Sequence, residues 1–152
     1  MQKLSEYKAK KQNQSVSLYN CLDYYSKNVN QIDDCICNIC HKNTKHNVNY
    51  FIYRSPNYFI FIINRSSKIN FEFPEEVNLE TFIEDEKGPK KYKLFSVLIN
   101  SVKVVNDNHY YAILKNSEQN WIKFDDEKIN QISQKEAHDP YYPRAIIYKG
   151  IK

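Results

Sequence analysis

The chain has 152 residues, of which 41% are hydrophobic and 26% are charged, and its formal net charge is +4. These proportions predict one globular domain and exclude a disordered chain. Only two glycines are present, which excludes a phosphate-binding loop or a dinucleotide fingerprint, because both need several glycines close together. Just three of the 22 cationic residues are arginines and the lysines are scattered, a pattern that disfavours nucleic acid as a partner.

The first residues are polar and rich in lysine. They predict a flexible basic tail over residues 1–16, followed by one folded domain over residues 17–152. No apolar stretch at the start resembles a secretory signal, and the longest apolar run, at residues 58–63, is far short of the roughly 20 residues that cross a bilayer. We therefore expect a protein of the cytoplasm, the nucleus or both, without a membrane partner.

A helix is predicted directly after the tail, from Leu18 to about Tyr25. Ser17 is a typical helix cap, and Leu18, Cys21, Leu22 and Tyr25 recur at the spacing of one helical face. The place of Cys21 on this apolar face assigns it to core packing rather than to nucleophilic catalysis. Residues 26–47 are polar and carry three cysteines, which predicts an irregular or extended segment.

The remainder is predicted to form a mainly antiparallel sheet. Strands are indicated at residues 48–53, 58–64, 92–105, 109–115, 121–125 and 145–148, with a brief helical turn at 79–83. The segment at 58–64 is so continuously apolar that we expect it to be buried on both faces. The polar connection at 116–120 predicts a hairpin between the strands on either side of it.

That hairpin would bring His109, at the start of one strand, to the same end of the sheet as Asp125, at the end of the other. An imidazole beside a carboxylate is an oriented general base, because the carboxylate fixes the tautomer and stabilises the imidazolium. On pattern alone, the alternative is an ordinary surface histidine near a turn aspartate, since no nucleophile accompanies the pair.

The cysteines allow two interpretations. Without a secretory signal, disulfides are not expected. The spacing of Cys37 and Cys40 matches half of a tetrahedral zinc site, because a tight turn can aim two thiolates at one metal. Two further ligands would be needed, for which Cys35, His41 and His46 are candidates. The alternative is that these cysteines lie in a loop without a metal.

Several segments, taken together, resemble the ubiquitin-specific proteases, cysteine peptidases that remove ubiquitin. SLYNCL at residues 17–22 is similar to the helix motif SL-x-x-CL, and CNIC at 37–40 resembles the second Cys-x-x-Cys pair of the zinc-binding fingers. Later segments follow in the order of the family: YFIFIINR at 58–65, FP at 73–74 with Leu79 and Phe82, YKL at 92–94, HY at 109–110, WIKFDD at 121–126 and AIIY at 145–148. The resemblance covers nearly all of residues 17–148.

The resemblance implies an α+β, papain-like cysteine-peptidase fold: a palm-like, mainly antiparallel sheet, one or two short helices and part of a fingers extension. It makes His109 the general base, Asp125 its orienting partner and Asp126 a supporting polar residue. It also implies a structural zinc ion held in part by Cys37 and Cys40, no cofactor for catalysis, and ubiquitin or ubiquitinated proteins as partners.

The family's cysteine box, which carries the nucleophile, has no counterpart in these residues, and neither does the first Cys-x-x-Cys pair of the fingers. One hypothesis is that the chain is the His/Asp-bearing part of a deubiquitinase whose cysteine comes from elsewhere, such as a separate chain. The alternatives are an inactive ubiquitin-binding remnant and an adaptor built around Cys37 and Cys40. Half of a two-lobed enzyme would expose apolar surface, so we expect the isolated chain to self-associate or to need a partner.

Overall fold

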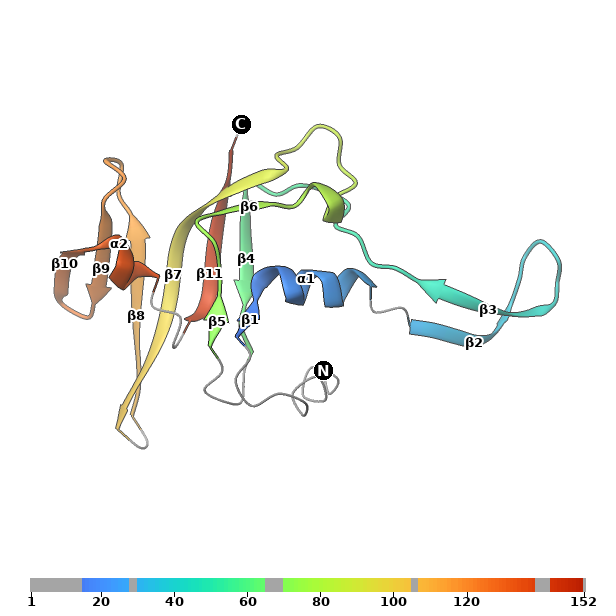
Figure 1. The fold of residues 1–152 in the computed structure, drawn as a ribbon, viewed down its shortest axis with the longest axis horizontal. Coiled ribbons are helices and arrows are strands. Elements are labelled where there is room, and N and C mark those ends of the chain that lie inside the picture. The colour runs from blue at the N-terminus through green and yellow to red at the C-terminus, as the bar shows by residue number, and fades with distance from the viewer. Residues whose placement is uncertain (1–14, 28–29, 65–69, 105–106, 139–142, 152) are drawn as a thin grey trace.

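The computed structural model describes residues 15–27, 30–64, 70–104, 107–138 and 143–151. Figure 1 shows a mainly antiparallel sheet accompanied by few helices, which confirms the predicted α+β class. The predicted tail lies almost entirely outside the described residues, but its last residue, Val16, pairs with Phe71 and so already belongs to the folded part. No described helix combines the length and the apolar character that crossing a membrane requires.

Within the described residues, seven strands form the main sheet, and all of its pairings are antiparallel. Six strands lie side by side in the order β10-β9-β8-β7-β11-β4. The seventh, β6, also pairs with β7 but stands outside this order. The bounds are β4 (Tyr58–Ile62), β6 (Glu76–Asn78), β7 (Lys91–Val104), β8 (Asp107–Lys115), β9 (Trp121–Asp125), β10 (Lys128–Ile132) and β11 (Pro143–Gly150). The sequence predicted all of these except β6 and β10.

The smaller elements lie around this sheet. β1 (Val16–Ser17) pairs in parallel with β5 (Phe71–Glu72), and β2 (Asn30–Ile36) pairs antiparallel with β3 (Asn43–Val48). The helices are α1 (Leu18–Lys27) and α2 (Gln134–Ala137), and the 3₁₀ turn η2 (Glu80–Phe82) confirms the turn predicted at 79–83. The expected cap of α1 is formed, because Ser17 Oγ accepts a hydrogen bond from the Asn20 N–H at 3.1 Å.

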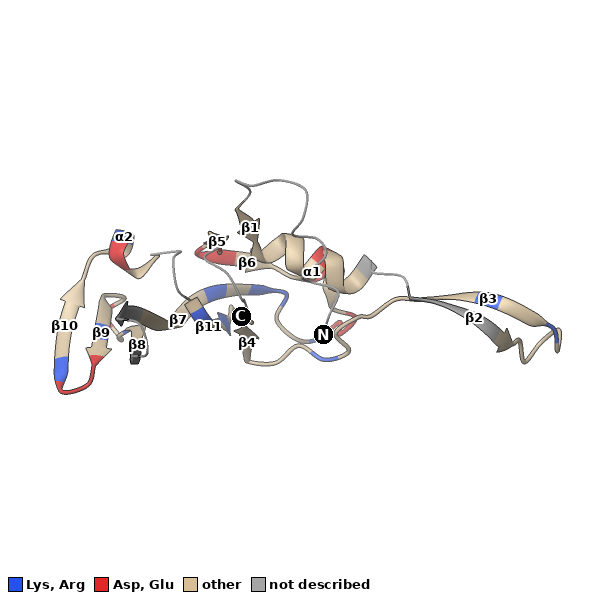
Figure 2. Ribbon diagram, turned by 90° about the horizontal axis from the view of Figure 1, so that it is seen from below, with Lys and Arg blue, Asp and Glu red and all other residues tan. Residues whose placement is uncertain are grey.

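The core lies on one face of the main sheet. Figure 2 shows α1 and β5 on the same side of the sheet portion formed by β7, β11 and β4. Leu18 and Leu22 of α1 are buried there together with Tyr92 of β7 and Tyr148 of β11. The hydroxyl of Tyr148 donates to the Pro74 carbonyl at 2.6 Å, which satisfies its polar atom. Burial raises the pKa of this tyrosine, so it stays neutral and serves packing.

The prediction that residues 58–64 are buried on both faces is wrong. β4 is the edge strand of the main sheet, where only β11 pairs with it. Its alternate residues Phe59 and Phe61 pack against the core, whereas Tyr58, Ile60 and Ile62 are exposed. A continuous apolar run is therefore also compatible with an edge strand that is buried on one face only. The uncovered apolar face of β4 is the kind of surface that we expect to favour association.

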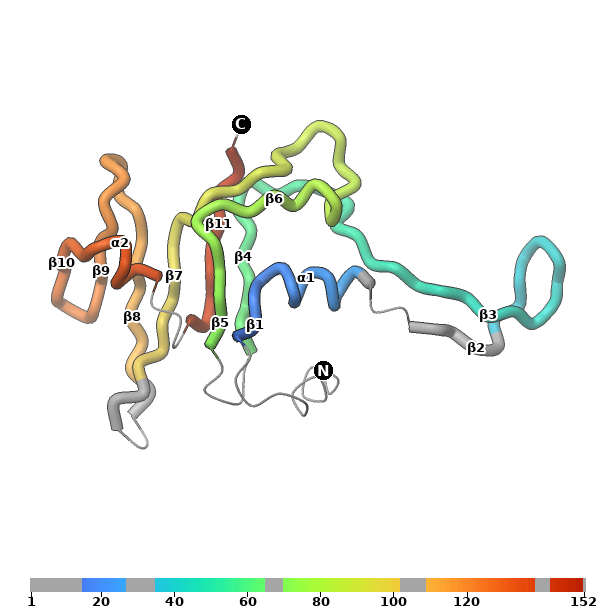
Figure 3. The backbone as a smooth tube through the Cα atoms, in the orientation of Figure 1, coloured from blue at the N-terminus to red at the C-terminus, as the bar shows by residue number. Residues whose placement is uncertain are grey.

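The prediction of an irregular or extended segment at 26–47 holds in its extended form from residue 30 on, where β2 and β3 pair as a hairpin. Its register joins Asn30 to Val48 and Ile36 to Asn43, with an irregularity between Ile32 and Cys35. The hairpin projects away from the main sheet in Figure 3. The strand predicted at 48–53 is wrong, because β3 ends at Val48, and Ile52 makes only an isolated bridge to Ile83.

Candidate active site

The strands that carry the predicted imidazole–carboxylate pair are neighbours in the sheet. The register of β8 and β9 runs from Lys115 opposite Trp121 to Ala112 opposite Phe124. Extending it by one position places Tyr111 opposite Asp125. Because side chains alternate between the faces of a strand, His109 shares the face of Tyr111 and Asp125. The hairpin therefore makes His109 and Asp125 diagonal neighbours at one end of the sheet.

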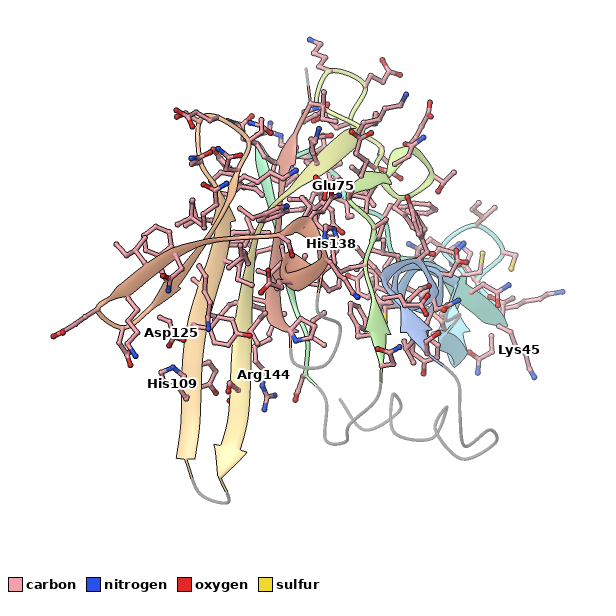
Figure 4. The ribbon with its side chains drawn as sticks, turned by 60° about the vertical axis from the view of Figure 1, so that its left-hand side comes forward. Lys45, Glu75, His109, Asp125, His138 and Arg144 are labelled. Atoms are coloured by element: carbon pink, nitrogen blue, oxygen red, sulfur yellow. The ribbon has the colours of Figure 1, made fainter. Side chains whose placement is uncertain are left out.

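The two side chains are in direct contact. His109 Nε2 and Asp125 Oδ1 are hydrogen-bonded, and Figure 4 shows both groups side by side near the start of β8. The side chain of His109 is 30% exposed and that of Asp125 is 18% exposed, so the pair is partly shielded yet accessible. An ionised carboxylate only accepts hydrogen bonds, so Nε2 carries the proton and Nδ1 of the neutral ring has a free lone pair. This is the geometry of an oriented base.

The second oxygen of Asp125 is also occupied. Lys123 Nζ lies 2.7 Å from Asp125 Oδ2, and the same ammonium lies 4.0 Å from the centroid of the Tyr111 ring. The Lys123 hydrogen bond first, and the His109 hydrogen bond next, lower the pKa of Asp125 to about 2. The stabilisation that these contacts add is therefore fully present above the ordinary aspartate pKa near 4. It is lost as the pH falls through about 2.

Asp126 occupies a different place from Asp125. It begins the two-residue turn between β9 and β10 with a left-handed backbone, φ 53°, a conformation that aspartate tolerates better than most residues. Its Oδ2 lies 3.9 Å from His109 Nδ1, and its side chain is 78% exposed. That distance is too long for a hydrogen bond. Asp126 therefore adds only a negative charge on the Nδ1 side of the ring.

His109, Asp125 and Asp126 also have ligand atoms within 4.8 Å of one another, the spacing of a metal site. Two features argue against a cation there. Asp125 already holds Nε2 of the imidazole in a direct hydrogen bond, whereas Asp126 lies near Nδ1 on the other side of the ring. The Lys123 ammonium already neutralises Asp125. The cluster is better suited to proton transfer than to metal binding.

The four cysteines do not reach this pair. Cys21 lies on α1, where burial raises the pKa of its thiol, as expected for a packing residue. The other three belong to the β2–β3 hairpin or its turn, at the opposite end of the molecule from β8 and β9 (Figures 1 and 2). None of them can attack a bond that His109 contacts in this arrangement.

Cys37 and Cys40 lie together in the turn of the β2–β3 hairpin. The backbone N–H groups of Cys40 and Ile39 and the Cys40 thiol hydrogen-bond to Cys37 and lower the pKa of its thiol. This favours a thiolate, the form that binds zinc. Among the described residues, however, no third ligand joins the two sulfurs in a set of metal-ligating side chains. Within the described part of the chain, Cys35, His41 and His46 do not join Cys37 and Cys40 in such a set.

A separate charged cluster lies further along the sheet. Glu75 contacts Lys115 of β8. Its Oε2 also lies 3.1 Å from His138 Nε2, at the end of α2, and Figure 4 shows Glu75 and His138 together. Two clefts of about 560 and 430 Å³ lie nearby, both lined by Lys93 and Lys115, and neither is lined by His109. Asp125 lines neither of these two clefts either.

The comparison with known families identifies the class of protein. The family model "Ubiquitin carboxyl-terminal hydrolase" matches residues 2–148, so this chain belongs to that family. It is 29% identical over 111 residues to ubiquitin carboxyl-terminal hydrolase 10 of Saccharomyces cerevisiae, covering 67% of this chain and 14% of that protein. It is 34% identical over 91 residues to the probable ubiquitin carboxyl-terminal hydrolase 16 of Schizosaccharomyces pombe, covering 54% of this chain and 20% of that protein.

Solved structures agree with this assignment. The SAGA DUB module of Ubp8, Sgf11, Sus1 and Sgf73 bound to monoubiquitin matches with a TM-score of 0.76 at 25% identity, over 90% of this chain and 33% of that one. The same module bound to ubiquitin aldehyde matches with a TM-score of 0.75 at 24% identity, over 90% and 34%. The papain-like fold inferred from the sequence is therefore confirmed. The chain spans about a third of these structures and a fifth or less of the two curated relatives.

Proposed function

We propose that this chain is the base-bearing part of a ubiquitin-specific cysteine protease, which cleaves peptide or isopeptide bonds after the C-terminal glycine of ubiquitin. The observation that carries the proposal is the hydrogen-bonded His109–Asp125 pair on adjacent strands of the sheet. Membership of the hydrolase family supports the substrate class, and a matched module has been solved with ubiquitin aldehyde.

The geometry suits His109 to take up and give back a proton in each half of the reaction. With Nε2–H donated to Asp125, the lone pair of Nδ1 accepts the proton of a cysteine thiol, and the thiolate attacks the glycine carbonyl carbon. The imidazolium then protonates the leaving lysine amine as the carbon–nitrogen bond breaks. In the second half of the reaction, His109 takes a proton from water as its oxygen attacks the thioester carbon, and the imidazolium then gives that proton to the sulfur as the carbon–sulfur bond breaks. Asp125 stabilises each imidazolium, and Asp126 adds negative charge nearby.

The nucleophilic thiol must come from outside these 152 residues, either from another segment of a longer polypeptide or from a separate chain. Cys21 is packed against the core, and the remaining cysteines are on a hairpin distant from the base. The alternative of an inactive ubiquitin-binding remnant is less well supported. A binding module has no use for a partly shielded imidazole whose carboxylate partner is held at both oxygens.

Under the same proposal, Cys37 and Cys40 supply two of the four ligands of a structural zinc ion in the fingers. The thiolate-favouring turn supports this role. The other two ligands would come from outside the described residues, and zinc binding stays a prediction.

Mapping the reactive cysteine tests the proposed function. The protein isolated from its native cells is treated with ubiquitin whose C-terminus carries a thiol-reactive group, and the labelled peptide is identified by mass spectrometry. We expect the label on a cysteine that is absent from these 152 residues. A label on Cys21, Cys35, Cys37 or Cys40, or no label on any associated cysteine, would contradict the proposal.

A further inference from the structure

We propose that Lys123 is a positioning residue of this site: together with the ring of Tyr111, it holds the Asp125 carboxylate in the one orientation that presents an oxygen to His109. This inference rests on the proposed function for its catalytic meaning. It deepens that proposal by assigning a role to a side chain that is neither the base nor its direct partner.

The need for such a residue follows from the freedom of an aspartate side chain. Rotation about its terminal carbon–carbon bond is broad, so a carboxylate held at one oxygen can swing away from its partner. Asp125 is held at both: Oδ1 by His109 and Oδ2 by Lys123 at 2.7 Å. Fixing the second oxygen fixes the plane of the group, and with it the direction of the hydrogen bond to the imidazole.

Lys123 can do this only if its own long side chain is held. Its ammonium lies 4.0 Å from the centroid of the Tyr111 ring, where the electron-rich face attracts a cation. The side chain is 26% exposed, so it is partly withdrawn from water. Lys123 and Asp125 are two residues apart on β9 and share a face, and Tyr111 lies on the same face of β8. The sheet itself therefore sets the spacing of all four groups, from Tyr111 through Lys123 and Asp125 to His109.

The charge of Lys123 adds a second effect. It lowers the pH at which Asp125 takes up a proton, since the hydrogen bond from Lys123 is the largest cause of the lowered carboxyl pKa. An ionised Asp125 is an acceptor only, and so it selects the Nε2–H tautomer of His109. Nδ1 is then left free for the thiol. Loss of Lys123 would raise the carboxyl pKa and free the carboxylate to turn, and a carboxylate turned away from Nε2 no longer selects that tautomer.

The test is made on the assembled enzyme, without ubiquitin. NMR of the aspartate carboxyl carbons follows the titration of Asp125, assigned with Asp125→Asn, and the ring nitrogens of His109 report its tautomer. In Lys123→Met we expect the Asp125 midpoint to rise by roughly one pH unit and a second tautomer of His109 to appear. Lys123→Arg should retain the wild-type values. Lys149→Met is the matched control, because Lys149 also lies over a tyrosine ring, Tyr58, at 5.9 Å.

An unchanged Asp125 midpoint and a single His109 tautomer in Lys123→Met would overturn the inference. So would equal shifts in Lys149→Met, which would indicate a general effect of charge. In the active assembly, Lys123→Met should lower kcat with little change in KM, since the residue acts on the base and not on bound ubiquitin. If the NMR shifts occur but the wild-type assembly has no activity, the positioning role stands and the proposed function fails.

Discussion

Replacing His109 with alanine is expected to slow the reaction of the assembled enzyme with a thiol-reactive ubiquitin probe by about 10² to 10⁴-fold. A positioned general base contributes a factor of this size. The variant removes the proposed base, and within the described residues no other imidazole contacts Asp125 or Asp126. The measurement is the rate at which the probe-linked product accumulates, followed by intact mass. The Asp125→Asn variant should also react slowly with the probe, because its neutral amide no longer stabilises the imidazolium.

The matched control is His46→Ala. His46 lies on β3, where its Nε2 contacts Thr44 Oγ1 at 2.8 Å, and the hairpin is distant from β8 (Figure 1). This variant should react at the wild-type rate. Unimpaired labelling of His109→Ala would show that another residue is the base.

Replacing Trp121 with alanine is expected to reduce the free energy of unfolding by about 3–5 kcal/mol, the usual cost of removing a buried aromatic side chain. Trp121 begins β9 and is 4% exposed. Its ring lies 5.9 Å from that of His138 and 4.8 Å from Lys115 Nζ. Because a domain is stable by only about 5–15 kcal/mol in total, the variant should show a much lower midpoint of urea unfolding, or no cooperative transition.

Ile129→Ala serves as the comparison for that variant. Ile129 is apolar and lies on β10, the strand that pairs with β9, but it is 64% exposed. Its truncation should change the free energy of unfolding by about 0.5 kcal/mol or less. Equal destabilisation by the two substitutions would mean that the core does not extend beneath β9, and that Asp125 is held by local contacts alone.

The sequence contains enough information to predict the pairing at the site. The apolar strands on either side of 116–120 identify a hairpin, and antiparallel pairing then places His109 beside Asp125. The turn is stabilised by Asn116, whose Oδ1 accepts hydrogen bonds from the Asn120 and Glu118 N–H groups. Such side-chain bonds to the backbone are typical of asparagine in turns. This local chemistry explains why that part of the prediction holds.

Other features depend on interactions that a single sequence does not display. β2 and β3 are polar, and backbone pairing forms their hairpin without an apolar pattern to indicate it. β4 looks buried because its run of apolar residues carries no sign that one face is uncovered. Lys123 shares a face with Asp125 by simple alternation, which was available from the sequence, but its salt bridge and its place over Tyr111 appear only when both strands are in register.

Hydrolysis of a fluorogenic amide at the C-terminus of ubiquitin tests the central claim most directly. The 152-residue chain is assayed alone and then after addition of a cysteine-bearing lobe from a related hydrolase, with that lobe alone as the reference. We predict no turnover by either part alone and turnover by the mixture, which Asp125→Asn suppresses. Turnover by this chain alone, or a mixture in which both parts associate and bind ubiquitin but release no fluorophore, would contradict it.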